Sequence, residues 1–580
     1  MGFLKQDAPV VDYAEWSKGT RAERIVPMAR HWAEVGFGTP VVMHLFYVVK
    51  ILLYVLVAWL IVLTTTGIDG FTNVAAWYHE PIVYQKVVFY TMLFEIIGLG
   101  CGFGPLNNRF FPPMGSILYW LRPSTIRLPP WPNRIPLTRG DSRTPVDVVL
   151  YGALLVMLLV ALFSDGTGPI PELGSQIGVL PVWQTVAILA LLALAGLRDK
   201  VLFLAARGEV YGALAVCFLF SGADIVIAAK LVCLVIWMGA ATSKLNKHFP
   251  FVISTMMSNN PVIRPRWIKR KFFEHFPDDL RPGRASRVLA HVSTAIEMLV
   301  PLVLFFSHGG WVTAMAAFVM LCFHFGILSA IPMGVPLEWN VFMMFSVLAL
   351  FVGNAGIGLG DLQSPWPLVL FAVSAGTVAI GNLFPRKVSF LPGMRYYAGN
   401  WDTSLWCVKP SADAKIAAGV VAIASMPAAQ MEKFYGSRET AEMYQYMGYA
   451  FRSFNTHGRG MFTLAHRLMA GHDEADYVLT DGERICSTAI GWNFGDGHMH
   501  NEQLIAALQK RCHFEPGEVR VLLLDAQPIH RQRQEYRLVD AATGEFERGY
   551  ILVADMVTRQ PWDDTVPVHV TWRKDMSETA

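Results

Sequence analysis

The sequence predicts a polytopic α-helical membrane protein with about ten membrane-spanning helices, followed by a C-terminal α+β domain in water. Two observations lead to this fold class. Hydrophobic residues make up 53% of the 580 residues and charged residues only 16%, whereas a soluble globular protein carries about 25% charged residues. The shortage of charge is concentrated in residues 39–385, and the composition after Pro385 is ordinary. The two regions therefore face different solvents.

Long apolar runs predict the individual spans, because about 20 apolar residues cross a bilayer as a helix. The fourth and fifth runs are short, so a tilted or partly re-entrant segment remains an alternative for each. The predicted spans cover residues 41–64, 84–103, 147–164, 182–197, 209–221, 223–243, 286–307, 310–331, 338–356 and 366–384.

The distribution of Lys and Arg orients these spans. Loops 66–83, 165–181, 307–310 and 357–365 contain no Lys or Arg, whereas the loops that alternate with them are basic. Basic loops stay on the cytoplasmic side of a membrane. We therefore expect a multi-pass protein of the bacterial inner membrane with both termini in the cytoplasm.

The same patterns predict the domain organisation. We expect an N-terminal cytoplasmic arm at 1–40, a transmembrane domain at 41–385, a linker at 386–430 and a cytoplasmic α+β domain at 431–580. Within the last domain, periodicity and turn residues predict several elements. These are helices at 437–453, 457–470 and 500–512, a hairpin over 476–492 turning at Asp481-Gly482, and strands at 518–525, 534–540 and 547–555.

Ionisable residues inside apolar spans are energetically costly and are candidates for function. The predicted spans contain Glu95, Lys230, His291, Glu297 and His324, and the first span contains His44 and Lys50 nearer one end. A carboxylate, a lysine and a histidine that face one bundle interior can perform acid–base chemistry in a dry cavity. The alternative is that these residues form internal ion pairs that fix helix packing, or that Lys50 and Lys230 extend toward the membrane surface.

The order of motifs from the sixth to the eighth span narrows the candidates. Gly239-Ala-Ala-Thr-Ser-Lys244-Leu245 closes the sixth span, the seventh contains His291 and Glu297, and the eighth contains Phe323-His324. Over residues 209–356 this order resembles the HTTM membrane domain of the vitamin K-dependent gamma-carboxylase family. The resemblance implies an HTTM-like bundle in which Lys244 is the base that deprotonates a reduced quinone. A quinone cofactor is implied by this resemblance alone.

The length, the span pattern and a Pro- and Arg-rich loop at 104–146 also resemble DUF3556, an uncharacterised bacterial family of transmembrane proteins. That resemblance implies no activity.

Two histidines in the C-terminal domain are weak candidates for metal binding. His498 and His500 could bind a metal together with Asp496 or Glu502, since imidazole and carboxylate are common ligands. The alternative is an ordinary loop before a helix that Asn501 caps.

Three functions remain open. The first is a membrane-embedded enzyme or binder for a quinone or lipid, with Lys244, His291, Glu297 and His324 as catalytic candidates. The second is a lipid or small-molecule transporter, and the third is a non-catalytic scaffold whose tail recruits a protein partner. The expected partners are membrane lipids, the quinone or lipid substrate and that protein. The net charge of +3 is too small to favour nucleic acid binding.

Overall fold

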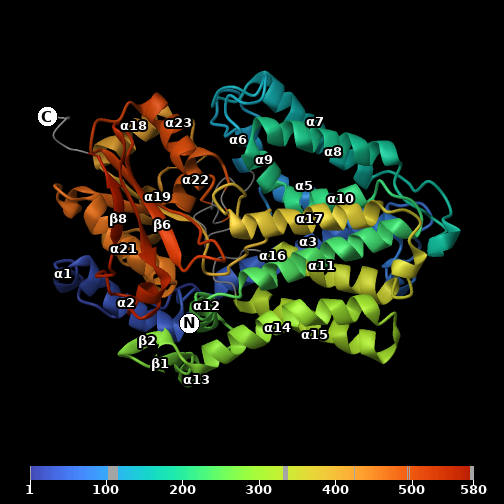
Figure 1. Cartoon of the computed structure of the whole chain (residues 1–580), viewed down its shortest axis with the longest axis horizontal. Helices are drawn as coiled ribbons and strands as arrows, with labels where there is room; N and C mark the ends of the chain where they lie inside the picture. The colour runs from blue at the N-terminus through green and yellow to red at the C-terminus, as the bar shows by residue number, and fades with distance from the viewer. Residues whose placement is uncertain are drawn as a thin grey trace.

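The computed structural model describes residues 2–101, 115–330, 337–423, 425–492, 494 and 497–574. The molecule has two parts that lie side by side (Figure 1). One is a bundle of long helices that run roughly parallel. The other contains a six-stranded sheet and packs against one end of the bundle. The N-terminal helices α1 (Tyr13–Trp16) and α2 (Arg21–Val35) lie beside the sheet-containing part.

Each predicted span lies on a helical segment of the bundle. These segments are α3 (Val41–Leu63), α5 (Pro81–Ile96), α7 (Pro145–Leu162), α8 (Val182–Arg198), η3 (Gly208–Gly212) with α10 (Ala213–Cys217), α11 (Ala223–Ser243), α14 (Arg284–Phe306), α15 (Gly310–Ala330), α16 (Leu337–Ser346) with η4 (Val347–Gly353), and α17 (Trp366–Leu383). The connections contain α4 (Val74–Trp77), α6 (Gly115–Trp120), η2 (Pro171–Leu173), α9 (Lys200–Ala205), α12 (Phe249–Asn259), α13 (Arg266–Arg270), β1 (Phe273–His275), β2 (Asp279–Pro282) and η5 (Leu359–Asp361).

Six helices of the described chain are long and apolar enough to cross a membrane, namely α3, α7, α11, α14, α15 and α17. A helix of 21 residues is about 32 Å long, which matches a hydrocarbon core of about 30 Å. The other predicted spans form shorter segments, and α5 contains Gln85, Lys86 and Glu95 within its 16 residues. The prediction of about ten complete spans is therefore not confirmed, while six candidate spans are present.

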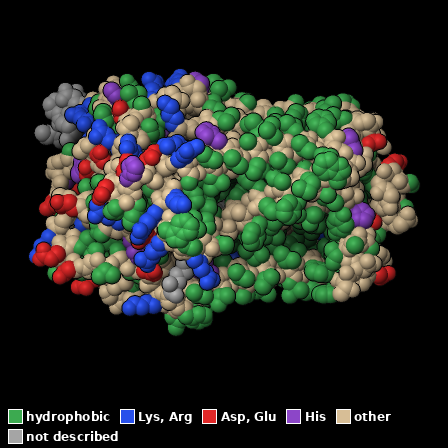
Figure 2. Space-filling model, turned by 90° about the horizontal axis from the view of Figure 1, so that it is seen from below, with side chains coloured by type: hydrophobic (Ala, Val, Ile, Leu, Met, Phe, Trp, Pro, Cys, Tyr) green, Lys and Arg blue, Asp and Glu red, His purple; other side chains and the backbone are tan. Residues whose placement is uncertain are grey.

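Helix α11 lies at the centre of the bundle. In its most apolar stretch 89% of the residues are buried, compared with 22–33% in the other five candidate spans. Those five helices therefore turn apolar side chains outward. On the face seen in Figure 2, apolar side chains cover the bundle, while charged side chains gather over the sheet-containing part. An extended apolar surface of this kind is what a lipid bilayer covers.

The sheet of the C-terminal part is antiparallel throughout, in the order β4-β3-β5-β6-β7-β8. Its strands are β3 (Thr403–Val408), β4 (Val478–Asp481), β5 (Val519–Leu524), β6 (Arg533–Asp540), β7 (Gly544–Leu552) and β8 (His569–Arg573). The helices of this part are α18 (Pro410–Gly419), α19 (Pro427–Tyr435), α20 (Arg438–Phe454), α21 (Thr456–Leu468), η6 (Glu474–Asp476), α22 (Gly482–Ala489), α23 (Glu502–Cys512) and α24 (Val553–Val557).

Most elements predicted for this part are confirmed, but the hairpin over 476–492 is wrong. Strand β4 ends at Asp481, and the Asp481 carboxylate accepts a hydrogen bond from the Glu483 N–H at 2.8 Å. The Asp481-Gly482 pair is thus the N-cap of helix α22 instead of a hairpin turn. The strand predicted at 547–555 ends at Leu552, and α24 follows it.

The sheet begins inside the segment 386–430 that was expected to be a linker. Strand β3 (Thr403–Val408) lies between β4 and β5, and all six of its residues are buried. A strand buried on both faces lacks the alternation of polar and apolar residues that marks a half-exposed strand. The sequence pattern therefore gave no signal for β3.

The N-terminal arm is packed against the sheet-containing part. The Tyr13 hydroxyl donates to the Glu442 carboxylate at 2.6 Å, and Arg24 forms an ion pair with the same carboxylate at 2.8 Å. The Trp32 indole donates to the Thr255 carbonyl of α12 at 3.2 Å. Residues from three distant segments of the chain therefore meet beside α20.

The described parts of the basic loops lie at the end of the bundle that carries the sheet. Side-chain contacts join Lys200 to Gln503, Asp279 to Gln560 and Asp141 to Arg511, at 2.9, 2.8 and 3.2 Å. The loops without Lys or Arg meet at the other end, where the Thr66 N–H donates to Asp165 at 2.7 Å. The basic loops and the loops without Lys or Arg therefore lie at opposite ends of the bundle, as the charge pattern predicts. That the basic end faces the cytoplasm stays a prediction.

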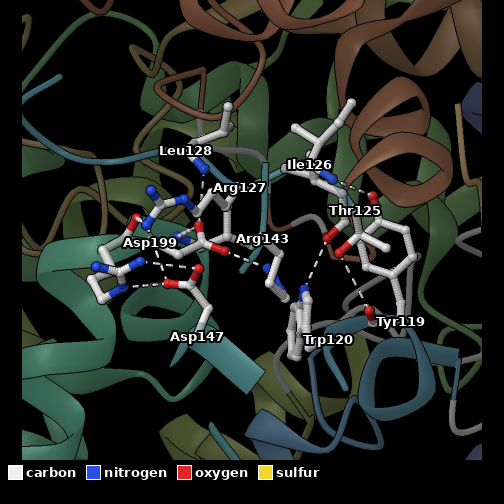
Figure 3. A network of polar contacts seen from close by, with 12 residues as sticks. Tyr119, Trp120, Thr125, Ile126, Arg127, Leu128, Arg143, Asp147 and Asp199 are labelled. Atoms are coloured by element: carbon white, nitrogen blue, oxygen red, sulfur yellow. Dashed lines mark hydrogen bonds and ion pairs between the residues drawn. The ribbon is translucent and has the colours of Figure 1, made fainter. Parts of the chain in front are cut away.

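Buried ion pairs hold the Pro- and Arg-rich loop between α6 and α7. Arg127 pairs with Asp147 at 3.1 Å and Arg143 with Asp199 at 2.5 Å, and all four side chains are buried. Figure 3 shows the two arginines and the two carboxylates gathered in one network. The loop is therefore fixed to the first turn of α7 and to the corner between α8 and α9.

Helix α6 joins the same loop to the sheet-containing part. Ser116, Tyr119 and Trp120 donate hydrogen bonds to three successive carbonyls at the end of α22, those of Gly491, Ala489 and Ile490 respectively. The last carbonyls of a helix have no partner within the helix, so α6 supplies the donors that they need.

Candidate functional site

The predicted Lys244 and Glu297 form an ion pair inside the bundle. Lys244 is the C-cap of α11, and its ammonium group donates a hydrogen bond to Glu297 Oε2 from α14. The Lys244 side chain is 10% exposed and the Glu297 side chain 3%. The lysine is therefore the more accessible partner of a carboxylate that is withdrawn from solvent.

Small residues let α11 approach its neighbours at this level. A Cβ atom added at Gly239 would lie 3.1 Å from side-chain atoms of both Met394 and Val378. Val378 belongs to α17, which packs closely along α11. The small-residue stretch before Lys244 thus serves helix packing and brings the lysine into the interior.

His324 of α15 is buried beside this pair, and both of its ring nitrogens are occupied. The Trp237 indole N–H donates to His324 Nε2 at 3.0 Å, and His324 Nδ1 lies 2.9 Å from Asn340 Oδ1. An indole nitrogen can only donate, so Nε2 carries no proton and Nδ1–H donates to the amide oxygen. This network assigns a neutral histidine that positions Trp237 and Asn340.

His291 does not join the other predicted site residues. The buried positions of α14 include Ala290, Thr294, Glu297 and Pro301, which recur every three to four residues. His291 falls outside this stripe and is exposed. Of the four catalytic candidates, the structure brings together Lys244, Glu297 and His324.

A second buried group of charges contains Glu95 and Lys50, which the sequence analysis singled out, together with Glu338, which it missed. Lys50 of α3 lies 2.7 Å from the Glu338 carboxylate of α16, and Lys50 also donates to the Gly100 carbonyl at 3.0 Å. Glu95 accepts a hydrogen bond from the Cys101 N–H at 2.6 Å. Glu338 lies in the first turn of the predicted ninth span, so the rule for ionisable residues in apolar spans could have found it.

A third ion pair adjoins this group. Arg207, the N-cap of η3, lies 2.7 Å from Glu209 within η3, and both side chains are buried. The Tyr396 hydroxyl donates to Glu209 at 3.4 Å. Arg207 interacts electrostatically with Glu95 as well, so the charges from α3, α5, η3 and α16 form one cluster. Arg207 lies just before the predicted fifth span. The sequence pattern therefore indicates only that it belongs to the end of a basic, cytoplasmic loop.

Three successive residues of α16 connect the two groups of polar side chains. Glu338 pairs with Lys50, while Asn340 bonds to His324. The Trp339 ring lies between them, with its centroid 6.1 Å from that of His324 and 5.5 Å from that of Tyr396. The first turn of α16 therefore couples the geometry of the site around Lys244 to the charge cluster around Lys50.

Lys230, another candidate from the sequence, has a structural role. Its ammonium group donates to the carbonyls of Asn354 and Ile357, at 2.9 and 2.6 Å. Asn354 is the C-cap of η4, where the helix leaves backbone acceptors without partners, and Ile357 lies in the segment that follows. Lys230 thus caps a helix end far along α11 from Lys244.

The weak metal candidates His498 and His500 contact different partners. His498 Nε2 donates to the Pro385 carbonyl at 2.8 Å, and His500 Nδ1 lies 2.7 Å from the Ser404 hydroxyl. Asp496 lies outside the described residues. Among the residues that the structure describes, no group of three or more His, Cys, Asp or Glu is arranged to hold a metal ion. Asn501 caps α23 as expected, accepting from the Gln503 N–H at 3.0 Å.

Comparison with known proteins supports the membrane assignment. A model of one protein family, described as a transmembrane protein of unknown function (DUF3556), matches residues 1–571. No curated protein and no solved structure gives a match.

Proposed function

The chain belongs to the DUF3556 family of transmembrane proteins, whose function is unknown, and we propose that it is a membrane-embedded enzyme or binder for a lipid-soluble substrate. The substrate class is a quinone or an acyl lipid whose polar end carries a carbonyl or an acidic hydroxyl group. The observation that carries the proposal is the Lys244–Glu297 pair, which is held inside an apolar bundle with the lysine partly accessible.

The pair provides the two functions that proton abstraction from such a group requires. The Glu297 carboxylate accepts the proton from the substrate hydroxyl, and the Lys244 ammonium group stabilises the resulting oxyanion. Both effects are stronger in a medium of low dielectric constant than in water. The HTTM resemblance implies that Lys244 is the base; the hydrogen bond from Lys244 to Glu297 favours Glu297 for this role.

His324 acts as a positioning residue in this proposal. Its two hydrogen bonds fix Trp237 of α11 and Asn340 of α16. Trp237 precedes Lys244 by seven residues, which places both on the same side of α11. A rigid wall next to the ion pair limits the orientations that a bound ring or carbonyl can adopt.

Access from the membrane is the natural route for a lipid-soluble substrate. Helices α14 and α15 carry Glu297 and His324 inward, and they expose Leu299 and Phe325 by 57% and 59%. With the basic loops on the cytoplasmic side, the proposed location is a bacterial inner membrane, with both termini and the sheet-containing part in the cytoplasm.

The test measures substrate binding by protein in lipid nanodiscs. Quinones and lipids that co-purify are extracted and identified by mass spectrometry, and the binding of a ubiquinone or menaquinone analogue is followed by quenching of tryptophan fluorescence. Lys244→Met and Glu297→Gln are each expected to weaken binding or turnover at least tenfold. Lys247→Met, three residues away and exposed, is the matched control and should bind like the wild type.

A charge-swapped variant separates chemistry from packing. Lys244→Glu combined with Glu297→Lys keeps an ion pair and should restore the melting temperature, but it moves the accessible ammonium group and should not restore binding. If folded Lys244→Met and Glu297→Gln proteins retain wild-type binding of every quinone and lipid found, the proposal is wrong.

A further inference from the structure

A pocket of about 460 Å³ lies where the N-terminal arm meets the start of α3 and the helices α19, α20 and α22. This volume falls within the range of roughly 300–1,000 Å³ that is typical of small-molecule sites. Its walls come from four segments that are distant in the sequence, namely residues 4–8, 37–43, 431–444 and Arg484.

Specific contacts hold these walls together. The Gln6 amide donates to the Phe37 carbonyl at 2.7 Å and accepts from the Tyr435 hydroxyl at 3.2 Å. The rings of Tyr435 and Tyr444 stack with centroids 4.1 Å apart. Gln6 thus joins the start of the arm to the segment before α3 and to α19, so tertiary contacts define the walls of the pocket.

The lining of the pocket is amphipathic. Most of the surface comes from aliphatic, methionine and aromatic side chains, and the thioethers of Met43, Met431 and Met443 adapt readily to a flexible chain. The charged lining residues are Lys5 and Arg484, and none is acidic. An occupant that matches this lining has a long apolar part and an anionic end.

Arg484 has no carboxylate within ion-pair distance among the described residues. Its guanidinium group contacts the Met431 sulfur at 3.8 Å. The carboxylate of Glu483 interacts electrostatically with Arg484, but its ion pair is with Arg452 at 2.8 Å. The guanidinium group therefore retains the capacity to bind a carboxylate or phosphate in a bidentate manner.

The position of the pocket brings it next to the membrane. Pro40 and Met43 line it, and α3 begins at Val41 as a candidate span. Two residues beyond Met43, α3 starts to expose apolar side chains at Leu45. An acyl chain in this pocket would therefore lie at the level where the span enters the bilayer.

We propose that this pocket binds one acyl chain that ends in an anionic group, with the anion held by Arg484 and Lys5. The proposal is independent of the site at Lys244, because it rests on other residues and other elements. The same chemistry is present in a free fatty acid and in an anionic phospholipid, and the experiment distinguishes these two sources.

The experiment uses the full-length protein and two kinds of probe. In detergent, a fluorescent fatty acid is titrated and competed with oleate. In nanodiscs of phosphatidylcholine with or without phosphatidylglycerol, the lipids retained on the purified protein are counted by native mass spectrometry. Competition by oleate identifies a free fatty acid as the ligand, and retention of phosphatidylglycerol over phosphatidylcholine identifies an anionic phospholipid.

The variants test the anion site and the chain site separately. Arg484→Gln should weaken binding about tenfold, which corresponds to the loss of one charge-assisted contact, whereas Arg484→Lys should keep most of the affinity. Met443→Trp should block the chain without changing the charge. Arg438→Gln, at an exposed position of α20 outside the pocket lining, is the matched control for the loss of a positive charge. Equal binding by Arg484→Gln and wild type, with both folded by their melting temperature, would overturn the proposal. Equal retention of zwitterionic and anionic lipids together with no competition by oleate would overturn it as well.

Discussion

Lys50 of α3 and Glu338 of α16 form a 2.7 Å ion pair whose side chains are 6% and 0% exposed. A buried charge that loses its partner is strongly destabilising, by about 3–5 kcal/mol, while removing both charges costs much less. We therefore expect Lys50→Met or Glu338→Gln alone to lower the melting temperature in detergent clearly. The double variant Lys50→Met with Glu338→Gln should recover most of the loss.

This double-mutant comparison also tests the coupling through α16. Because Glu338 and Asn340 lie in one helical turn, loss of the Lys50 pair should shift His324 and weaken substrate binding at Lys244 more than the change in stability accounts for. Additive effects of the two single variants on stability would contradict the assignment of a direct pair.

The Arg143–Asp199 pair should contribute far more stability than an exposed pair of the same type. Asp199 accepts from the Leu128 and Val201 N–H groups, each at 3.1 Å, and binds Arg143. Asp199→Asn should cost about 3–5 kcal/mol, because the Arg143 charge stays buried without compensation.

The matched control for this prediction is Asp278→Asn. Asp278 is 83% exposed and pairs with Arg30 at 3.2 Å, and exposed pairs contribute about 0–1 kcal/mol. Thermal unfolding followed by intrinsic fluorescence compares the two variants. Equal shifts of the melting temperature would mean that the buried network does not hold the loop between α6 and α7.

Two buried histidines outside the spans predict acid-sensitive stability. Burial lowers the pKa of His248 to about 4 and holds the pKa of His457 well below its usual value of 6.5. Arg395 adds to the effect at His248, and Arg452 and Arg459 add to it at His457. Both side chains therefore stay neutral in the native state at pH values where they are charged in the unfolded chain.

The direction of the pH dependence follows from proton uptake. Between pH 6.5 and about 4 the unfolded state binds more protons than the native state, so the free energy of unfolding falls as the pH falls. The slope is at most about 1.4 kcal/mol per pH unit for each histidine. Melting temperatures measured from pH 7 to pH 5 should decline less steeply in His248→Asn than in the wild type. His513→Asn, at an exposed position, should leave the slope unchanged, and an unchanged slope in His248→Asn would contradict the prediction.

The sequence predicts the segments of the bundle well, because hydrophobicity and loop charge are local properties. It does not determine which residues of a helix face each other across the bundle. His291 and Glu297 both lie in one predicted span, yet only Glu297 faces Lys244. The Lys50–Glu338 contact joins residues 288 positions apart, so no local pattern could reveal it.

In the C-terminal part, too, a local sequence pattern did not determine the structure. Asp481-Gly482 has the composition of a hairpin turn, but Asp481 caps a helix because α22 packs beneath β3. Tertiary contacts thus decided between two local structures that the dipeptide permits equally. The resemblance to the HTTM domain remains a prediction.

The compartment of the sheet-containing part can be tested by cysteine labelling. Glu439 is exposed on α20, and Thr72 is exposed in a loop without Lys or Arg at the opposite end of the bundle. The positive-inside rule places Glu439 in the cytoplasm and Thr72 outside. A single cysteine at position 72 should therefore react with a membrane-impermeant maleimide in intact cells, while a cysteine at position 439 should react only after lysis.

The labelling experiment requires a protein whose native cysteines do not react with the maleimide. The native Cys322 of α15 is exposed, while the other native cysteines are buried, so Cys322→Ser removes the main source of unwanted reaction. Labelling of position 439 in intact cells would reverse the orientation. It would also place the basic loops outside, because the contacts of Lys200, Asp279 and Asp141 tie those loops to the same part of the molecule. Labelling of both positions in intact cells would mean that an even number of segments crosses the membrane between residues 72 and 439, which contradicts the grouping of the loops at opposite ends of the bundle.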